Sequence, residues 1–202
     1  HDWMVEFISF DPKRFIGVAV IPLYDDVGKA VADLEKYGKK GLRTALIRFQ
    51  PPEGRPPLRD PVYDPFWAAA QDLGVIISLH IGGGGTPDPL HAHTPREQEE
   101  GPGRMIAIDY EIMGVLANEF IFGAILDRFP RLKLVCSEFE ISWIPSFMSR
   151  IDQIQQDYAH RMPIPTLEMQ ASDYMRQRIY HGFIDDPYAL PILPLMGSDA
   201  VV

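Results

Sequence analysis

The chain has 202 residues, of which 46% are hydrophobic and 23% charged, a globular composition that supports one core and a single domain over residues 1–202. Its 28 acidic and 19 basic residues give a net charge of −9, which argues against nucleic acid or an anionic membrane as the main partner. One cysteine, Cys136, excludes an internal disulfide framework, and with no run of about 18 apolar residues we expect a soluble, cytoplasmic protein.

Strand and helix patterns alternate along the first part of the chain. Residues 15–21 (FIGVAVI) are a nearly continuous apolar run, which predicts a strand buried on both faces. Asp25 and Asp26 then open a helix whose apolar residues recur at helical spacing until Gly38. Residues 42–48 (LRTALIR) are predicted to form the next strand.

The third strand is predicted at residues 75–80 (VIISLH). It follows a helix that has Pro65 in its first turn and Gly74 just past its end. The strand leads into four consecutive glycines, residues 82–85, and a long helix over residues 108–116 comes after a polar loop. This part of the chain therefore continues the strand-then-helix pattern.

Two further strands are predicted at residues 132–137 and 179–183, and a sixth begins at Ala200. Helices are predicted after the first two of these strands, over residues 147–158 and 187–196. Such alternation indicates a parallel sheet, hence a (β/α)₈ barrel or a doubly wound fold. The doubly wound alternative is disfavoured because no strand, glycine loop and helix form a nucleotide-binding signature.

Both ends of the sequence differ from those of an ordinary gene product. The chain begins at His1, without an initiator methionine, in a segment that reads as the middle of a helix. It ends on the apolar residues 200–202. Because chain ends are usually exposed, we interpret the sequence as part of a longer protein. The alternative is a domain with an unusual start and stop.

Polar side chains stand where the predicted strands end. Arg48, His80 and Glu138 occupy these positions, and His181 lies within the fifth strand. In a (β/α)₈ barrel the functional groups come from the carboxyl ends of several strands. An imidazole and a carboxylate on a rigid sheet suit Zn²⁺ with an open position for water or substrate.

Each of these residues also has a structural interpretation. A lone histidine such as His80 is more often a hydrogen-bonded core residue than a metal ligand. Spacing alone favours an ion pair between Glu138 and Arg48. The neighbours of His181 do not show whether its side chain faces the helices or the other side of the sheet.

Several other patterns imitate functional motifs. His91 and His93 are spaced like a ligand pair, but they lie between prolines without a strand, which favours a solvated loop. The four glycines of residues 82–85 lack the phosphate-loop pattern, and a tight turn explains them equally well. Cys136 lies inside an apolar strand, where a thiol is expected to be inert.

Longer segments resemble the amidohydrolase-2 family, the branch of the amidohydrolase superfamily that contains aminocarboxymuconate-semialdehyde decarboxylase. The resemblance rests on residues 11–23 (DPKRFIGVAVIPL), 60–70 (DPVYDPFWAAA), 78–80 (SLH), 127–133 (DRFPRLK) and 143–145 (WIP). These segments occur in the family's order over nearly the whole chain. The resemblance implies an incomplete (β/α)₈ TIM barrel of the amidohydrolase type, in which the visible strands are the third to the eighth.

The resemblance also implies roles for individual residues. Family members bind one divalent metal, usually zinc, through a pair on the first strand, a histidine ending the fifth and an aspartate ending the eighth. His80 matches the fifth-strand ligand, and Glu138 stands where the family often has a catalytic histidine. Asp199 precedes the last apolar residues, so we interpret it as a lead-in to the strand and not as the eighth-strand ligand.

The expected function is metal-dependent hydrolysis or non-oxidative decarboxylation of a small carboxylate or aromatic-derived substrate. By resemblance His80 holds the metal, Glu138 acts in proton transfer or as a ligand, and Arg48 binds a substrate carboxylate. The alternative is an incomplete barrel with only a structural or association role. Because missing strands leave open sheet edges, we expect a homo-oligomer, most simply a dimer.

Overall fold

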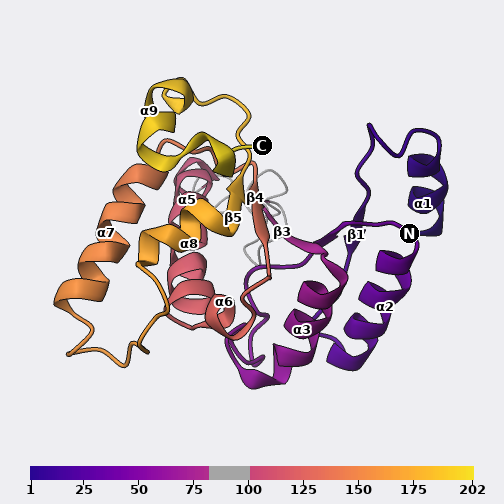
Figure 1. Cartoon of the computed structure of the whole chain (residues 1–202), viewed down its shortest axis with the longest axis horizontal. Coiled ribbons are helices and arrows are strands. Elements are labelled where there is room, and N and C mark those ends of the chain that lie inside the picture. Colours follow the sequence, from indigo (N-terminus) through magenta and orange to yellow (C-terminus); the bar gives the residue numbers. More distant parts are fainter. Residues whose placement is uncertain (82–100) are drawn as a thin grey trace.

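The structure, a computed structural model, describes residues 1–81 and 101–202 and centres on a parallel sheet of five strands (Figure 1). The strands are β1 (Val18–Val20), β2 (Thr44–Leu46), β3 (Ile76–His80), β4 (Leu134–Ser137) and β5 (Ile179–His181). Each strand is hydrogen-bonded to the next in sequence, in the order β1-β2-β3-β4-β5. A doubly wound sheet reverses its order at a switch point, so this sequential order is that of a barrel wall.

The sixth predicted strand is reduced to an isolated β-bridge. Val201 forms an isolated parallel bridge with His181, and the backbone N–H of Val202 donates to the carbonyl of His181 at 3.0 Å. The chain therefore continues the sheet on the β5 side in the predicted direction. The other strands are shorter than predicted, because apolar residues extend beyond the paired ladder at their ends.

Helices follow the strands as the alternation predicts. They are α1 (Asp2–Ser9), α2 (Val27–Lys39), α3 (Asp64–Leu73), α5 (Gly101–Val115), α6 (Ile125–Arg128), α7 (Ile144–Asp157), α8 (Ala171–Gln177) and α9 (Ala189–Met196). Short helical turns occur at η1 (Pro61–Tyr63) and η5 (Ser198–Ala200), and α5 continues into the π-helix η4 (Leu116–Ile121). Figure 1 places α1 and α2 at one end of the longest axis and α7 at the other. Within the described ranges, no helix has the length and apolar character needed to cross a membrane.

Local signals in the sequence set the helix ends. The Asp26 carboxylate accepts a hydrogen bond from the backbone N–H of Lys29 at 3.0 Å, as expected of an N-cap before α2. Gly74 ends α3 in the left-handed conformation, with φ of +64°. The helices α6 and α8 were not predicted, because four and seven residues are too few to show a helical periodicity.

The sheet has two sides that differ in burial. Residues that pair between parallel strands share a side, and neighbouring residues along a strand alternate. We call one the helix-facing side; its members, each at most 2% exposed, are Ala19, Ala45, Ile77, Leu79, Leu134, Cys136, Ile179 and His181. The other, the open side, consists of Val18, Val20, Thr44, Leu46, Ile76, Ser78, His80, Val135, Ser137 and Tyr180, of which Thr44 and Ser78 are buried.

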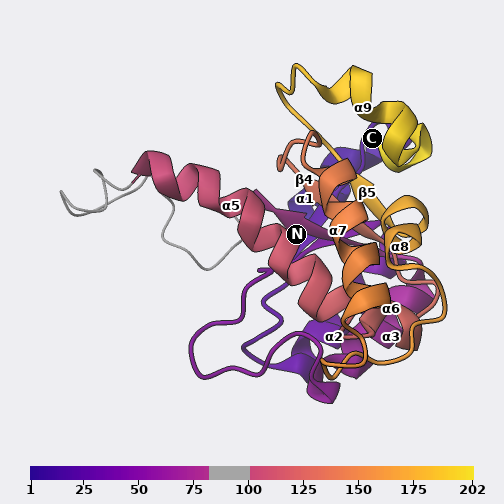
Figure 2. The same ribbon diagram turned by 90° about the vertical axis from the view of Figure 1, so that its left-hand side faces the viewer.

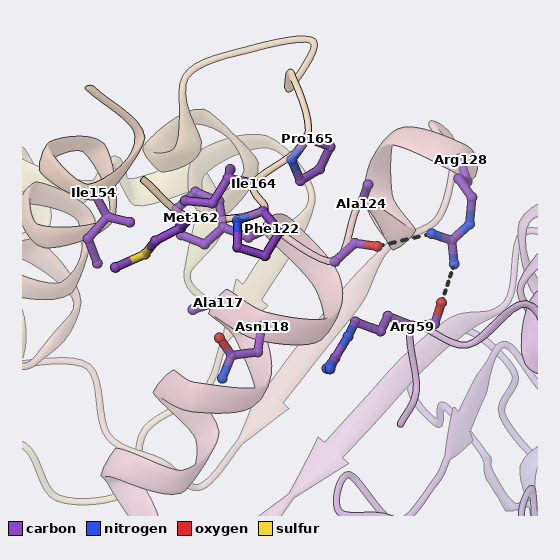
Figure 3. A pocket seen from close by; sticks show the side chains of 12 residues that line it. Arg59, Ala117, Asn118, Phe122, Ala124, Arg128, Ile154, Met162, Ile164 and Pro165 are labelled. Carbon is purple, nitrogen blue, oxygen red and sulfur yellow. Dashed lines mark hydrogen bonds between the residues drawn. The ribbon is translucent and has the colours of Figure 1, made fainter. Parts of the chain in front are cut away.

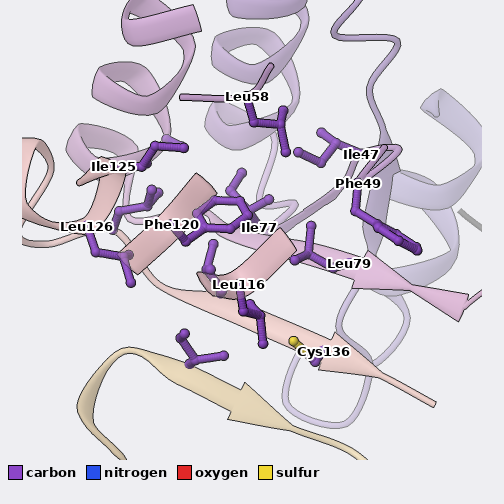
Figure 4. Close-up of a cluster of buried hydrophobic side chains, with 14 of the residues drawn as sticks. Ile47, Phe49, Leu58, Ile77, Leu79, Leu116, Phe120, Ile125, Leu126 and Cys136 are labelled. Carbon is purple, nitrogen blue, oxygen red and sulfur yellow. The ribbon is translucent and has the colours of Figure 1, made fainter. Parts of the chain in front are cut away.

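The part of the helix-facing side on β3 and β4 packs against η4 and α6. Figure 4 shows Ile77 and Leu79 of the sheet beside Leu116, Phe120 and neighbouring helical side chains. All four of these residues are fully buried. At about 25 cal/mol per Å² of apolar surface removed from water, this layer supplies a large part of the folding free energy. Figure 2, turned by 90°, shows α5 running across the sheet.

Candidate functional site

His80 and Glu138 meet at the carboxyl edge of the sheet. His80 is the last residue of β3, and its strand partner Ser137 is the last residue of β4, so Glu138 follows directly beside it. His80 Nε2 lies 3.2 Å from Glu138 Oε2, and the two side chains are 34% and 45% exposed. Both groups can therefore reach a small molecule at this edge.

The backbone around Glu138 adopts an unusual conformation. Glu138 has φ of +67° and Glu140 has φ of +50°, in the left-handed region that non-glycine residues rarely occupy. Such a conformation costs roughly 1 kcal/mol or more per residue. The intervening Phe139 is buried, with its ring 5.7 Å from that of Phe49 in an edge-to-face arrangement. The strained turn is thus anchored in the core and directs Glu138 towards His80.

Trp143 supports the same turn from the other side. Its indole N–H donates to the carbonyl oxygens of Phe139 at 2.8 Å and Glu140 at 3.1 Å. The ring also lies edge-on to His181, with centroids 6.0 Å apart. Trp143 belongs to the WIP segment that resembles the family, and its role in the structure is to hold the carbonyl groups of the turn.

Arg48 lies at the same edge of the sheet, next to β3. Leu46 pairs with Ser78, and Arg48 and His80 each lie two residues further along their chains. The Arg48 side chain is exposed, and its carbonyl accepts a hydrogen bond from the Tyr24 hydroxyl at 3.0 Å. Burial is the main cause that raises the pKa of Tyr24, so this hydroxyl stays a donor.

The predicted ion pair between Arg48 and Glu138 is not found. In the ranges 1–81 and 101–202 the only ion pair of Glu138 is with His80. The reason is the left-handed turn at Glu138, which strand spacing cannot anticipate. The exposed Arg48 side chain is therefore not the partner of Glu138.

Two serines on the open side were not singled out from the sequence. Ser78 Oγ and Ser137 Oγ lie 3.4 Å apart, and Ser137 is the strand partner of His80. The alternation of sides along β3 could have identified Ser78 from the sequence. Ser78 stands two residues before His80 and therefore lies on the same side of the sheet. The serines add hydroxyl groups next to the His80–Glu138 pair.

His181 faces the helix layer and not the site. It is 1% exposed, and neither ring nitrogen has a hydrogen-bond partner among the described residues. Burial lowers its pKa to about 3, so the ring is neutral at physiological pH. The strand partner Cys136 is also buried, which raises the pKa of its thiol and agrees with an inert side chain.

Other motifs contribute no group that the structure places at this edge. Residues 82–85, His91 and His93 lie outside the described ranges. Asp199 is exposed within η5. Among the described residues, no three His, Cys, Asp or Glu side chains are grouped so that they could hold a metal ion. His80 and Glu138 therefore supply at most part of a ligand set.

A cavity of about 800 Å³ lies away from His80, between η4, α7 and the loop at residues 162–165 (Figure 3). Its polar side chains are those of Arg59, Asn118 and Arg128, and the guanidinium groups of the two arginines already bind protein oxygens. Arg128 donates at 3.0 Å to the carbonyls of Gly123 and Arg59. Arg59 pairs with the buried carboxylate of Glu119. These bonds close the corner after α5, so we assign the arginines a structural role.

The sequence matches the amidohydrolase family (Amidohydro_2) over residues 1–188, and the chain belongs to this family. The family predicted from the short segments is confirmed. A comparison with curated proteins finds no match.

Solved structures share the fold over the whole chain. The 5-carboxyvanillate decarboxylase LigW from Sphingomonas paucimobilis matches 100% of this chain with a TM-score of 0.76 and 21% identity, over 58% of its own length. The 2,6-dihydroxybenzoate decarboxylase from Rhizobium matches with a TM-score of 0.69 and 21% identity, over 100% of this chain and 62% of its own.

A third structure contains a metal. The 5-carboxyvanillate decarboxylase from Novosphingobium aromaticivorans DSM 12444, complexed with manganese and 4-hydroxy-3-methoxy-5-nitrobenzoic acid, has a TM-score of 0.78 and 18% identity, with 100% of this chain and 56% of its own covered. This chain thus spans less than two thirds of each of these proteins. The likeness establishes the amidohydrolase-type barrel fold that was predicted.

Proposed function

We propose that this chain carries part of the active site of a metal-dependent enzyme that acts on a small aromatic carboxylate. The observation that carries the proposal is the 3.2 Å approach of His80 Nε2 and Glu138 Oε2 at the carboxyl edge of the sheet. The similar folds belong to decarboxylases named for 5-carboxyvanillate and 2,6-dihydroxybenzoate, which favours non-oxidative decarboxylation. Hydrolysis is the second candidate, because it is the reaction that the family's name describes.

The donor atoms of the site fit a divalent transition metal. An imidazole nitrogen and a carboxylate oxygen are acceptable ligands for both Zn²⁺ and Mn²⁺. We predicted zinc from the sequence, whereas manganese is bound in three similar structures. His80 would hold the ion and Glu138 would lie beside it, with further ligands from residues outside the described pair. When bound, such an ion acts as a Lewis acid toward substrate oxygens.

Two side chains of this chain would act on the substrate itself. Decarboxylation replaces a carbon–carbon bond by a carbon–hydrogen bond, so a proton must reach the carbon that loses carbon dioxide. Glu138 is exposed enough to exchange its proton with solvent and is held beside His80, which suits a general acid and base. Arg48 can bind a carboxylate through two parallel hydrogen bonds and so orient the ring.

The experiment is a metal and activity measurement on three proteins. The full chain, His80→Ala and the control His160→Ala are purified, loaded with Zn²⁺ or Mn²⁺ and analysed for bound metal. His160 is exposed and remote from β3 in sequence, so its substitution controls for the loss of an imidazole. Release of carbon dioxide from 5-carboxyvanillate and 2,6-dihydroxybenzoate is then followed.

The expected result is metal in the parent and in His160→Ala and a loss of at least tenfold in metal affinity in His80→Ala. Equal metal binding by all three proteins would overturn the ligand role of His80. Bound metal without turnover of either carboxylate would favour the other interpretation from the sequence, a barrel segment whose role is structural or associative.

We also infer that copies of this chain associate. Val20 lies on the edge strand β1, where its side chain is 57% exposed while its backbone N–H donates to the His1 ring at 2.9 Å. An exposed apolar side chain on an edge strand promotes pairing. A dimer is the expected state, in a reducing compartment such as the cytoplasm because the chain has a single cysteine. Light scattering coupled to size-exclusion chromatography measures the mass, and a monomer at micromolar concentration would contradict the inference.

A further inference from the structure

Two loops at the carboxyl edge of the sheet are tied to each other by a pair of carboxylates. The first loop follows β4 and contains residues 138–143, and the second follows β5 and contains residues 182–188. From the first loop, the carboxylate of Glu140 accepts backbone hydrogen bonds from Ile184 at 3.2 Å and Asp185 at 3.3 Å. These partners are 44 and 45 residues away in the sequence.

The second loop returns the interaction through Asp186. Its carboxylate accepts backbone hydrogen bonds from Ile141 at 2.9 Å and Ser142 at 2.6 Å, and a third from Tyr188 at 3.0 Å. Burial alone would raise the pKa of Asp186, but these backbone donors outweigh it and lower the pKa. Each loop thus contributes one carboxylate and two backbone donors to the other, and we call this arrangement the carboxylate clasp.

The clasp acts on the turn that carries Glu138. Residues Glu138 and Glu140 are both left-handed, and the clasp binds the second of these directly. Phe139 and Trp143 anchor the middle of the turn, but neither contacts the backbone N–H groups that follow Glu140. Without the clasp, the N–H groups of Ile141 and Ser142 lose the Asp186 acceptor, and the Glu140 carboxylate loses its two donors. Only Phe139 and Trp143 then hold the turn against relaxation to negative φ. A change of φ at Glu138 moves its carboxylate away from His80.

We propose that Glu140 and Asp186 are positioning residues that hold the Glu138 carboxylate beside His80. The inference rests on the proposed function, in which Glu138 transfers the proton, and it assigns that function two further residues. It also gives the strain at Glu138 and Glu140 a purpose, since backbone strain persists only where surrounding contacts compensate for it.

The first test measures the position of Glu138 without metal or substrate. Selective ¹³C labelling of histidine and glutamate allows nuclear Overhauser effects between the His80 ring and the Glu138 side chain to be recorded. The variants are Glu140→Ala and Asp186→Ala, and the matched control is Asp157→Ala, an exposed carboxylate at the end of α7. Amide hydrogen exchange is measured in the same samples.

We expect the nuclear Overhauser effect between His80 and Glu138 in the parent and in Asp157→Ala. In both clasp variants its intensity should fall severalfold or be lost. The backbone amides of residues 141, 142, 184 and 185 should exchange at least tenfold faster in those variants. An unchanged effect in folded Glu140→Ala and Asp186→Ala would overturn the proposal. If the alanine variants do not fold, Glu140→Gln and Asp186→Asn keep the size of each side chain and must show the same change in weaker form.

The second test uses turnover in the assay with 5-carboxyvanillate. The clasp variants should lower kcat at least tenfold with little change in KM, because Arg48 and not Glu138 binds the carboxylate. When Glu138 is already replaced by Gln, the clasp substitutions should lower kcat no further. A general structural defect would lower kcat in that background as well. Additive losses of kcat in the double variants would overturn the positioning role. Absence of turnover in the parent would contradict the proposed function, and the spectroscopic result would then decide whether the clasp positions Glu138.

Discussion

The two sides of the sheet use the same strands for different purposes. On the helix-facing side Ile77, Leu79 and Cys136 are buried, and Figure 4 shows them beside side chains of η4 and α6. On the open side Val20 is more than half exposed, and His80 stands partly exposed beside Glu138. Alternation along each strand separates the two sets, so a one-residue shift in register would exchange them. Stability and chemistry are thereby assigned to opposite sides, and substitutions on each should have different consequences.

The largest expected effect on stability comes from the helix-facing side. Leu79→Ala removes a fully buried side chain from the cluster in Figure 4, and truncations of this kind cost about 3 kcal/mol in the free energy of unfolding. The matched substitution on the open side, Val20→Ala, should cost less than about 0.5 kcal/mol. Urea unfolding of both variants measures the difference, and equal losses would contradict the division of the sheet into two sides.

A smaller effect is expected from pH, through His181 on the helix-facing side. Its folded pKa of about 3 lies below the ordinary value of 6.5, so the unfolded chain binds a proton first as the pH falls. The stability due to the neutral ring is complete above pH 6.5 and is lost on acidification towards pH 3. At pH 5 the loss should be about 2 kcal/mol.

The variant His181→Phe keeps an aromatic ring beside Trp143 but cannot be protonated. Its free energy of unfolding should therefore vary less between pH 7 and pH 5 than that of the parent. The slope of the free energy of unfolding against pH is compared between the two proteins, because this slope and not the absolute free energy reports the protonation of His181. Parallel slopes would show that His181 is protonated in the folded state or exposed to solvent.

The smallest change in stability is expected at the site on the open side. Glu138→Gln removes the charge of a partly exposed pair, and such pairs contribute about 1 kcal/mol or less. Thermal unfolding should shift by only a few degrees, while kcat in the carboxylate assay should fall by roughly a hundredfold and stay measurable. A large loss of stability would mean that Glu138 is a structural residue.

Much of the fold could be predicted because its signals are local. Apolar runs mark the strands, Asp26 and Gly74 mark helix ends, and the alternation of the two patterns indicates a parallel sheet. The barrel type is then confirmed by the sequential strand order. The short helices α6 and α8 were missed because tertiary contacts and not periodicity stabilise them. In α8, for example, the Tyr174 hydroxyl donates to Asp127 from a distant segment.

The site was predicted only in part. Its residue types and the position of His80 at a strand end follow from the chain alone, and the roles of His80, Glu138 and Arg48 remain predictions. The partner of Glu138 could not be found, because spacing suggested Arg48 and the left-handed turn brings His80 instead. The serine pair and the clasp join residues far apart in the sequence, so no local pattern reveals them.

The sequence by itself therefore determined the family, the order of strands and helices and the presence of an imidazole and a carboxylate at neighbouring strand ends. These properties depend on hydrophobic period and on short motifs, which act over a few residues. Only the tertiary structure decided that His181 faces the helices, that Glu138 approaches His80 and that Glu140 and Asp186 tie two loops together. Those outcomes depend on strand register and on backbone dihedral angles, which are set by contacts across the whole sheet.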